Sequence, residues 1–179
     1  MAAPRALHYT TDDEACRLLA ADPFALLVGF ALDQQVTVPT AFAGPLKLRQ
    51  RLGTLDPATV AKAELEPLFK QSPAIHRFPG TMAQRVRDLA QHVLDEYDGD
   101  AARIWTEARD TDDLRRRLEA LPGFGEMKIK SLGAVLSKRF GLAKAAPLAP
   151  DHPTLGDVDS PEALQEYQAW KRASKRSRS

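Results

Sequence analysis

The segment with the clearest chemical meaning is the turn Leu121-Pro122-Gly123-Phe124-Gly125, which joins two amphipathic stretches. Glycines in such a turn permit positive φ angles and allow another surface to approach the backbone closely. The amides at the start of the following helix then point outward, and with the helix dipole behind them they suit a phosphate oxygen. We therefore predict a phosphate-binding site at this turn. The alternative is an ordinary helix–helix turn, which often contains one glycine.

Other reactive side chains give weaker signals. His76 and His152 are too few for a catalytic zinc site without added carboxylates, and no HExxH spacing occurs. We interpret His76 as a loop or pocket histidine whose hydrogen bonds are satisfied. Cys16 is the single thiol, which excludes a disulfide framework, a cysteine zinc site and a four-cysteine iron–sulfur cluster within one chain. We expect no metal site and no redox cofactor.

Charge is distributed unevenly along the chain. All 24 acidic residues precede Lys171, while five of the 25 basic residues lie in 171–179. That leaves 20 basic against 24 acidic residues, so residues 1–170 carry −4 and the tail carries +5. A basic run of this kind indicates either polyanion binding or a solubilising terminus. We predict that 171–179 is a basic, disordered tail.

The elements that must position these residues are helical by their periodicity. The chain has 179 residues, of which 44% are hydrophobic, enough for one compact domain or two small lobes. No stretch alternates as a strand does, and no apolar run approaches the ~18 residues of a membrane span. We predict an all-α protein with no membrane partner, in which 142–159 is a long loop or linker. The main expected helices span 24–36, 39–53, 81–100, 112–121, 126–141 and 160–175.

Three blocks taken together resemble the helix-hairpin-helix DNA glycosylase superfamily, which includes endonuclease III and the alkylbase glycosylases. The blocks are FALLVGFALDQQVTVPTA, TMAQRVRDLAQHVLDEYDGD and the glycine hairpin, and their order and spacing match over residues 23–141. The stretch QSPAIHRFPGTMAQRV resembles a bacterial branch of this superfamily that lacks the iron–sulfur cluster.

The resemblance implies a two-lobed fold. One helical lobe would span 23–141, with the hairpin at 113–140, and residues 1–22 together with 142–170 would form the other lobe. Double-stranded DNA carrying a damaged base would lie across the cleft, bent so that a base can flip out of the stack.

Site residues follow from the same resemblance. Gln34 and Gln35 stand where the family inserts a polar side chain into the gap left by the extruded base; otherwise they are two solvated residues at a helix end. The family's phosphate contact would come from the hairpin and the start of its second helix. The DNA-binding residues implied there are Gly123, Phe124, Gly125, Lys128 and Lys130.

The sequence departs from the family pattern at the nucleophile. Bifunctional members have a lysine where Met127 stands, and Lys128 is offset by about 100° around the helix. Without a correctly placed amine no Schiff base forms, so the resemblance implies a monofunctional enzyme that needs only a carboxylate to stabilise a sugar cation. Asp151 in PLAPDHPT best matches the family's catalytic aspartate. The alternative candidates for the catalytic aspartate are Asp33, Asp157 and Asp159.

The expected function is base-excision DNA repair by hydrolysis of an N-glycosidic bond. The resemblance implies a monovalent cation held by hairpin carbonyls, and we expect a monomer in the bacterial cytoplasm, associated with the nucleoid. Two alternatives remain open. One is a non-catalytic DNA-binding protein that kept the scaffold, and the other is a structural helical module in which the hairpin is merely a turn.

Overall fold

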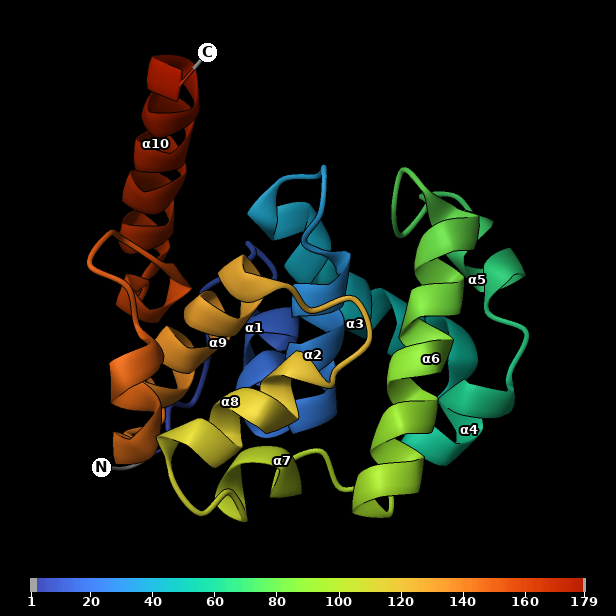
Figure 1. The fold of residues 1–179 in the computed structure, drawn as a ribbon. Coiled ribbons are helices and arrows are strands. Elements are labelled where there is room, and N and C mark those ends of the chain that lie inside the picture. The colour runs from blue at the N-terminus through green and yellow to red at the C-terminus, as the bar shows by residue number, and fades with distance from the viewer. Residues whose placement is uncertain (1–2, 179) are drawn as a thin grey trace.

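The computed structural model describes residues 3–178, and within this range it contains helices and no strands (Figure 1). This confirms the all-α prediction. The helices are α1 (Asp13–Ala21), α2 (Pro23–Leu32), α3 (Val38–Leu52), α4 (Pro57–Lys62), α5 (Glu66–Lys70), α6 (Pro79–Tyr97), α7 (Arg103–Thr106), α8 (Thr111–Glu119), α9 (Glu126–Lys138) and α10 (Pro161–Arg178), with 3-10 turns η1 (Ala143–Leu148) and η2 (Leu155–Asp157).

Helix α2 runs through the middle of the molecule (Figure 1). Asp22 caps it by accepting a hydrogen bond from the Phe24 amide at 2.9 Å, and Pro23 occupies the first turn, where its missing N–H costs nothing. Every residue from 24 to 32 is buried. Helix α3 packs so closely on α2 that a Cβ at Gly29 would lie 2.3 Å from the Phe42 ring. Helix α2 ends at Leu32, and the polar residues begin at its C-cap, Asp33.

A single apolar core extends through the described residues, from Leu7 near the start to Leu164 in α10. Burial of this surface is the main term that stabilises the fold. Within residues 3–178 no single helix is long and apolar enough to span a membrane. Helices α1 and α2 would pass by length and composition if taken together, but they are bent by 115° relative to each other.

The segment before α1 is joined to η2 through Tyr9, whose buried hydroxyl donates a hydrogen bond to the Leu155 carbonyl at 3.0 Å. The 142–159 segment, expected as a loop or linker, contains η1 and η2 and packs on α9. Gly156 lies so close to α9 that a Cβ there would come within 2.7 Å of the Ala134 carbonyl group. This segment is thus an integral part of the core. The division into two lobes stays a prediction.

The basic tail is not disordered over its described part. Helix α10 begins at Pro161, with the Ser160 hydroxyl accepting from the Ala163 amide at 3.0 Å, and continues to Arg178. The prediction of disorder was therefore wrong for residues 171–178, whereas the helix expected over 160–175 is present and extends to Arg178. The high helix propensity of Lys, Arg and Ala lets the packed first half of the helix extend through the charged half. Ser179 lies outside the described residues.

Candidate nucleic-acid interface

The predicted hairpin is present between α8 and α9, but its two glycines have different roles. Gly123 adopts a φ of +79°, and a Cβ there would lie 2.9 Å from the Cδ and Nε atoms of Arg85. Gly125 has an extended backbone with φ −94° and ψ −175° and is the N-cap of α9. A Cβ at Gly125 would meet nothing within 4 Å. Gly123 thus permits the turn and a close contact, whereas the space beside Gly125 is open.

Phe124 and Lys128 point into the molecule. Phe124 is only 7% exposed, so its ring supports the hairpin from below. The Lys128 ammonium lies 5.8 Å from the centre of that ring and donates a hydrogen bond to the Ala31 carbonyl at 3.4 Å. Burial lowers the pKa of Lys128, nearby Arg85 lowers it further, and Asp33 opposes both effects. Lys128 therefore joins the hairpin to the end of α2.

Arg85, which no sequence motif singles out, links the two predicted DNA-contacting segments. Its guanidinium donates a hydrogen bond to the side-chain carbonyl of Gln34, and its stem packs against Gly123. Gln34 is exposed beyond the end of α2. Arg85 lies in the first half of the strongly amphipathic α6. Its role could not be predicted from that helix alone, because α6 also carries Arg87 and two glutamines.

The turn after α2 is held in a defined shape. Gln35 has a positive φ of 58°, and its carbonyl accepts a hydrogen bond from Arg77 at 3.5 Å. The His76 Nε2 lies 3.1 Å from both the Leu32 and the Gln34 carbonyl oxygens, and its Nδ1 accepts from the Phe78 amide at 3.0 Å. Burial lowers the pKa of His76. Its neutral form therefore anchors the turn, as expected for a histidine with satisfied hydrogen bonds.

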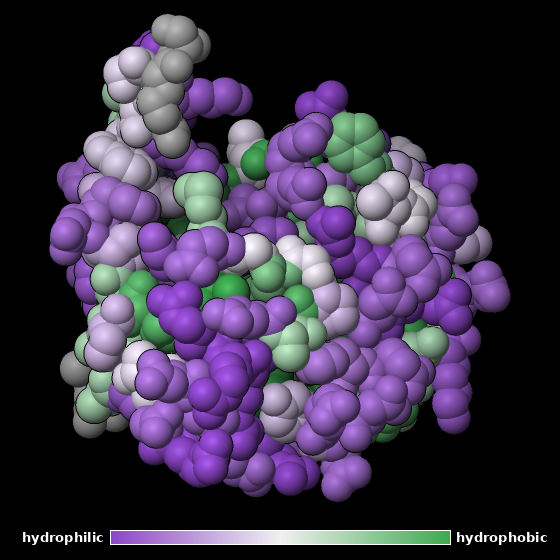
Figure 2. Space-filling model, viewed as in Figure 1, coloured by the Kyte–Doolittle hydropathy of each residue, from purple (hydrophilic) through white to green (hydrophobic). Residues whose placement is uncertain are grey.

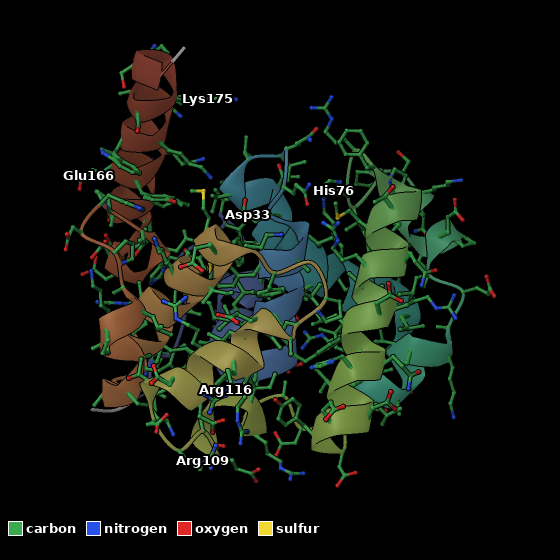
Figure 3. All side chains as sticks on the ribbon, viewed as in Figure 1. Asp33, His76, Arg109, Arg116, Glu166 and Lys175 are labelled. Carbon is green, nitrogen blue, oxygen red and sulfur yellow. The ribbon has the colours of Figure 1, made fainter. Side chains whose placement is uncertain are left out.

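Asp33 lies at the centre of this region. Figure 3 shows Asp33 and His76 between α10 on one side and the start of α6 on the other. Burial raises the pKa of the Asp33 carboxyl, and the positive charges of Lys171 and Lys128 oppose that rise. On sequence grounds Asp33 ranks behind Asp151 as a candidate for the catalytic carboxylate. The signal in the sequence is a carboxylate that directly follows a fully apolar helix and precedes the glutamine pair.

The remaining predicted residues lie elsewhere. A hollow of about 390 Å³ between α9, the 150–154 segment and α10 is lined by Met127, Lys130, His152 and Trp170, among others. The rings of His152 and Trp170 stack at 5.8 Å. Asp151 is exposed and does not line this hollow, and no described contact joins it to Gln34 or Arg85. The structure brings Gln34, Lys128 and Gly123 together, with Gln35 adjacent to Gln34, and does not bring Asp151 to them.

The other alternative carboxylates differ from Asp33 in their contacts. Asp157 accepts from the Thr154 amide at 2.9 Å and from the Lys138 ammonium at 2.6 Å, so it is committed to holding η2 on α9. Asp159 is exposed beside it. Within residues 3–178 no group of three His, Cys, Asp or Glu side chains is placed to hold a metal ion. The monovalent cation at the hairpin stays a prediction.

The surface between α10 and the start of α6 is hollowed, and its walls are mostly hydrophilic (Figure 2). Met127 and Phe78 are the two large hydrophobic side chains that are well exposed within the described residues, at 73% and 39%. Comparisons of the chain with known protein families, curated proteins and solved structures found no match. The function of this surface therefore has to be inferred from its geometry and from the sequence resemblance.

Proposed function

We propose that this protein binds duplex DNA and releases a damaged base by hydrolysing its N-glycosidic bond, without cleaving the strand. The observation that carries the proposal is the position of Arg85. It contacts Gly123 in the hairpin and Gln34 in the turn after α2, the two segments that the resemblance assigns to DNA. Because one arginine holds both segments, the hairpin and Gln34 would contact the same duplex, the hairpin at a phosphate and Gln34 at the gap in the base stack.

The hairpin would hold a DNA phosphate through the amides at the start of α9. The first four amides of a helix lack intrahelical acceptors, and the open space at Gly125 lets an oxygen approach them. Glu126 carries the one negative charge in this turn, and Arg115 binds its carboxylate at 3.1 Å. That ion pair reduces the repulsion a phosphate would meet.

Gln34 would fill the space that an extruded base leaves. Extrusion is required because an enzyme cannot reach the glycosidic bond inside a stacked duplex. His76 fixes the Gln34 backbone and Arg85 fixes its side chain, so little conformational entropy remains to be lost when the side chain enters the stack. A rigid insertion residue lowers the free-energy cost of keeping the base out.

Asp33 is the carboxylate best placed for the chemistry. In the hydrolysis, the bond between the base nitrogen and the sugar C1′ breaks, a water oxygen bonds to C1′, and the base leaves with a proton. A carboxylate stabilises the positive charge that develops on the sugar and accepts a proton from the water. Asp33 is half-buried next to Gln34, whereas Asp151 is exposed in a different segment. We therefore assign this role to Asp33.

The non-catalytic alternative has one observation in its favour. Met127 occupies the position of the family's lysine, and its side chain is 73% exposed, with no amine at that point. A DNA-binding protein that lost its nucleophile would have this arrangement. Base release by the purified protein separates the two functions.

The test uses labelled duplexes that each carry one alkylated, deaminated or oxidised base. The wild-type protein is expected to release the free base from at least one duplex, leaving a site that breaks only after alkali. Borohydride should trap no covalent complex, because no lysine occupies the position of Met127. Asp33→Asn should lose base release while keeping its DNA affinity, and Asp151→Asn serves as the matched control.

The outcomes are distinguishable. Loss of activity in Asp151→Asn but not in Asp33→Asn would return the carboxylate role to Asp151. A borohydride-trapped complex would overturn the monofunctional assignment and direct attention to Lys128. DNA binding without base release from any duplex would establish the non-catalytic function. Because the pKa of Asp33 is raised, base release should fall on acidification at a higher pH than for an exposed aspartate.

A further inference from the structure

The second half of α10 presents a basic face to an open groove. The groove has a volume of about 690 Å³ and lies between α10 and the 35–38 segment. Its α10 wall is formed by Gln168, Lys171, Arg172 and Lys175, which recur at the spacing of one helix face. Figure 3 places Lys175 on the side of α10 that faces α6, and Glu166 on the opposite side. Lys175 therefore faces the groove, and Glu166 faces away from it.

Arg77 supplies a fourth cation from a different element. It lines the opposite wall, with its guanidinium 5.0 Å from the centre of the Phe78 ring and its NH1 3.5 Å from the Gln35 carbonyl. Both contacts leave the positive charge without a carboxylate partner. A cation held against a ring and a carbonyl is oriented before any ligand arrives, which reduces the entropy lost on binding.

Among the described residues, the four cations of the groove lack a carboxylate partner at ion-pair distance, and Asp33, whose rise in pKa Lys171 opposes, does not line the groove. None of the residues that line the groove is acidic, and within residues 3–178 none of the four forms an ion pair within 4.0 Å. Holding like charges around one groove is unfavourable unless an anion enters it. A polyanion that entered the groove would relieve this repulsion.

The groove is continuous with the interface already described. Gln35 lines it and directly follows Gln34, which Arg85 connects to the hairpin. A polyanion that contacts the hairpin and continues past Gln34 thus enters the groove. Duplex DNA fits this path because it carries one negative charge per ~1.7 Å of helix axis, whereas a single phosphorylated side chain would reach one cation at a time.

We propose that the groove between α10 and the 35–38 segment binds a second stretch of the DNA backbone. Arg77 contacts it from one wall, and Lys171, Arg172 and Lys175 contact it from the other. This inference rests on the proposed DNA-binding function and adds a second binding site to it. The site makes no base contacts, so it contributes affinity without sequence preference.

The experiment measures the affinity of the full chain for a fluorescent undamaged duplex over a range of salt concentrations. The test variant combines Lys171→Gln, Arg172→Gln and Lys175→Gln, which are exposed positions where glutamine keeps a high helix propensity. The matched control combines Arg5→Gln, Arg17→Gln and Lys62→Gln, three exposed cations on the N-terminal segment, α1 and α4. Both variants remove three positive charges.

We expect the test variant to bind at least tenfold more weakly. The slope of log K against log salt should decrease in magnitude by roughly 2 to 3, because each phosphate that no longer pairs with a cation reduces it by about 0.9. The control should stay within about twofold of the wild type, because distant charges are screened. Arg77→Gln alone, on the other wall, should flatten the slope by about 0.9. Circular dichroism confirms that each variant keeps its helix content.

Other results would overturn the proposal. Equal slopes for the test and control variants would rule out the groove as a DNA site. A separate variant, Gly125→Asp, which adds a negative charge at the hairpin, would still test whether the hairpin binds DNA. Absence of any binding by the wild-type protein would overturn both the groove and the proposed function. Binding to phosphatidylserine vesicles that needs Lys171, Arg172 and Lys175, without binding to the duplex, would assign the groove to a membrane surface instead.

Discussion

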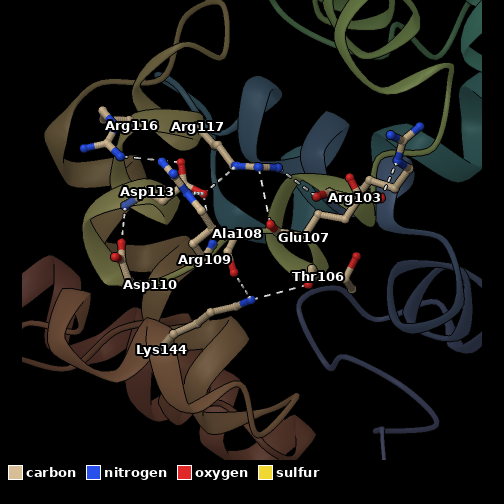
Figure 4. Close-up of polar contacts among 10 residues, drawn as sticks. All are labelled: Arg103, Thr106, Glu107, Ala108, Arg109, Asp110, Asp113, Arg116, Arg117 and Lys144. Carbon is tan, nitrogen blue, oxygen red and sulfur yellow. Dashed lines mark hydrogen bonds and ion pairs between the residues drawn. The ribbon is translucent and has the colours of Figure 1, made fainter.

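Two regions rich in arginine and lysine differ in how their positive charges are paired. At the base of the molecule, around α7 and α8, the buried Asp113 carboxylate accepts from the Arg109 amide at 2.9 Å and from the Arg117 Nε at 3.2 Å (Figure 4). Arg117 also donates to the Arg103 and Glu107 carbonyls. The cations there satisfy carbonyls and carboxylates, so they hold α7 and α8 together.

In the groove beside α10 the same residue types have no carboxylate at ion-pair distance among the described residues. Lys171 contacts the Tyr167 ring at 5.9 Å, and Arg77 contacts the Phe78 ring. The number of basic residues in a segment therefore does not locate a binding surface. Residues 115–117 are three consecutive arginines and are mostly paired internally, whereas the cations of the groove remain available to a ligand. Variants of each region should therefore affect different properties.

The largest effect on folding is expected from Asp113→Ala. The variant leaves the Arg109 amide and the Arg117 Nε without the carboxylate that accepts their hydrogen bonds, which costs more than those hydrogen bonds contributed. The melting temperature should fall far more than in Asp112→Ala, a neighbouring exposed control. The hydrogen bond from the Arg109 amide lowers the pKa of Asp113 below the usual aspartate value of 3.8. The stability that the Asp113 carboxylate contributes should therefore persist on acidification to about pH 3.8 and be lost progressively below it. A similar melting temperature in both variants would contradict the structural role of this region.

The largest effect on DNA binding is expected from Gly125→Asp. The new carboxylate would face the phosphate, and a like-charge contact at an interface costs several kcal/mol, which corresponds to a loss of affinity of roughly a hundredfold. Aspartate is also a good N-cap, so the melting temperature should not fall. Gly125→Asn, an equally good cap without the charge, is the control and should keep most of the affinity. Equal affinities of the two variants would rule out an electrostatic contact with DNA here.

Gly123→Ala should destabilise the protein by about 1–2 kcal/mol, because alanine is strained at a positive φ. It should also weaken DNA binding, since the new Cβ displaces Arg85 from its position beside Gln34. Gly53→Ala is the control, because Gly53 has a φ of +95° with open space around it. It should show a similar loss of stability in urea unfolding and no loss of affinity. If both variants bind DNA equally well, Arg85 does not link the hairpin to Gln34 in the way we infer.

The smallest expected effect is a pH dependence at His76. Its pKa is lowered in the folded protein, so the unfolded chain binds the proton more readily. The stability contributed by neutral His76 is complete above the usual histidine pKa of about 6.5 and is lost as the pH falls through the lowered value. The difference in melting temperature between the wild type and His76→Gln should therefore shrink from about pH 8 to about pH 5. A difference that does not depend on pH would contradict the neutral, anchoring role.

Much of the fold could be predicted because its signals are local. The hairpin helices were expected at 112–121 and 126–141 and lie at 111–119 and 126–138. Capping residues and apolar spacing act within one or two turns, so they can be read from adjacent letters. The helix expected over 24–36 instead ends at Leu32, because His76 binds the carbonyl groups of Leu32 and Gln34 and holds the chain there in a turn. That partner lies more than forty residues away in the chain.

What the amino-acid sequence determined by itself is the helical class, the glycine turn between two amphipathic helices and the exclusion of cysteine-based metal and disulfide chemistry. The tertiary structure decided which charges are paired. Only packing brings Arg85 to Gln34 and Gly123, buries Asp33 beside Lys128, and separates the cations around Asp113 from those beside α10. The physical reason is that the energy of a charge depends on its burial and on neighbours distant in the sequence, and these exist only once the helices have packed.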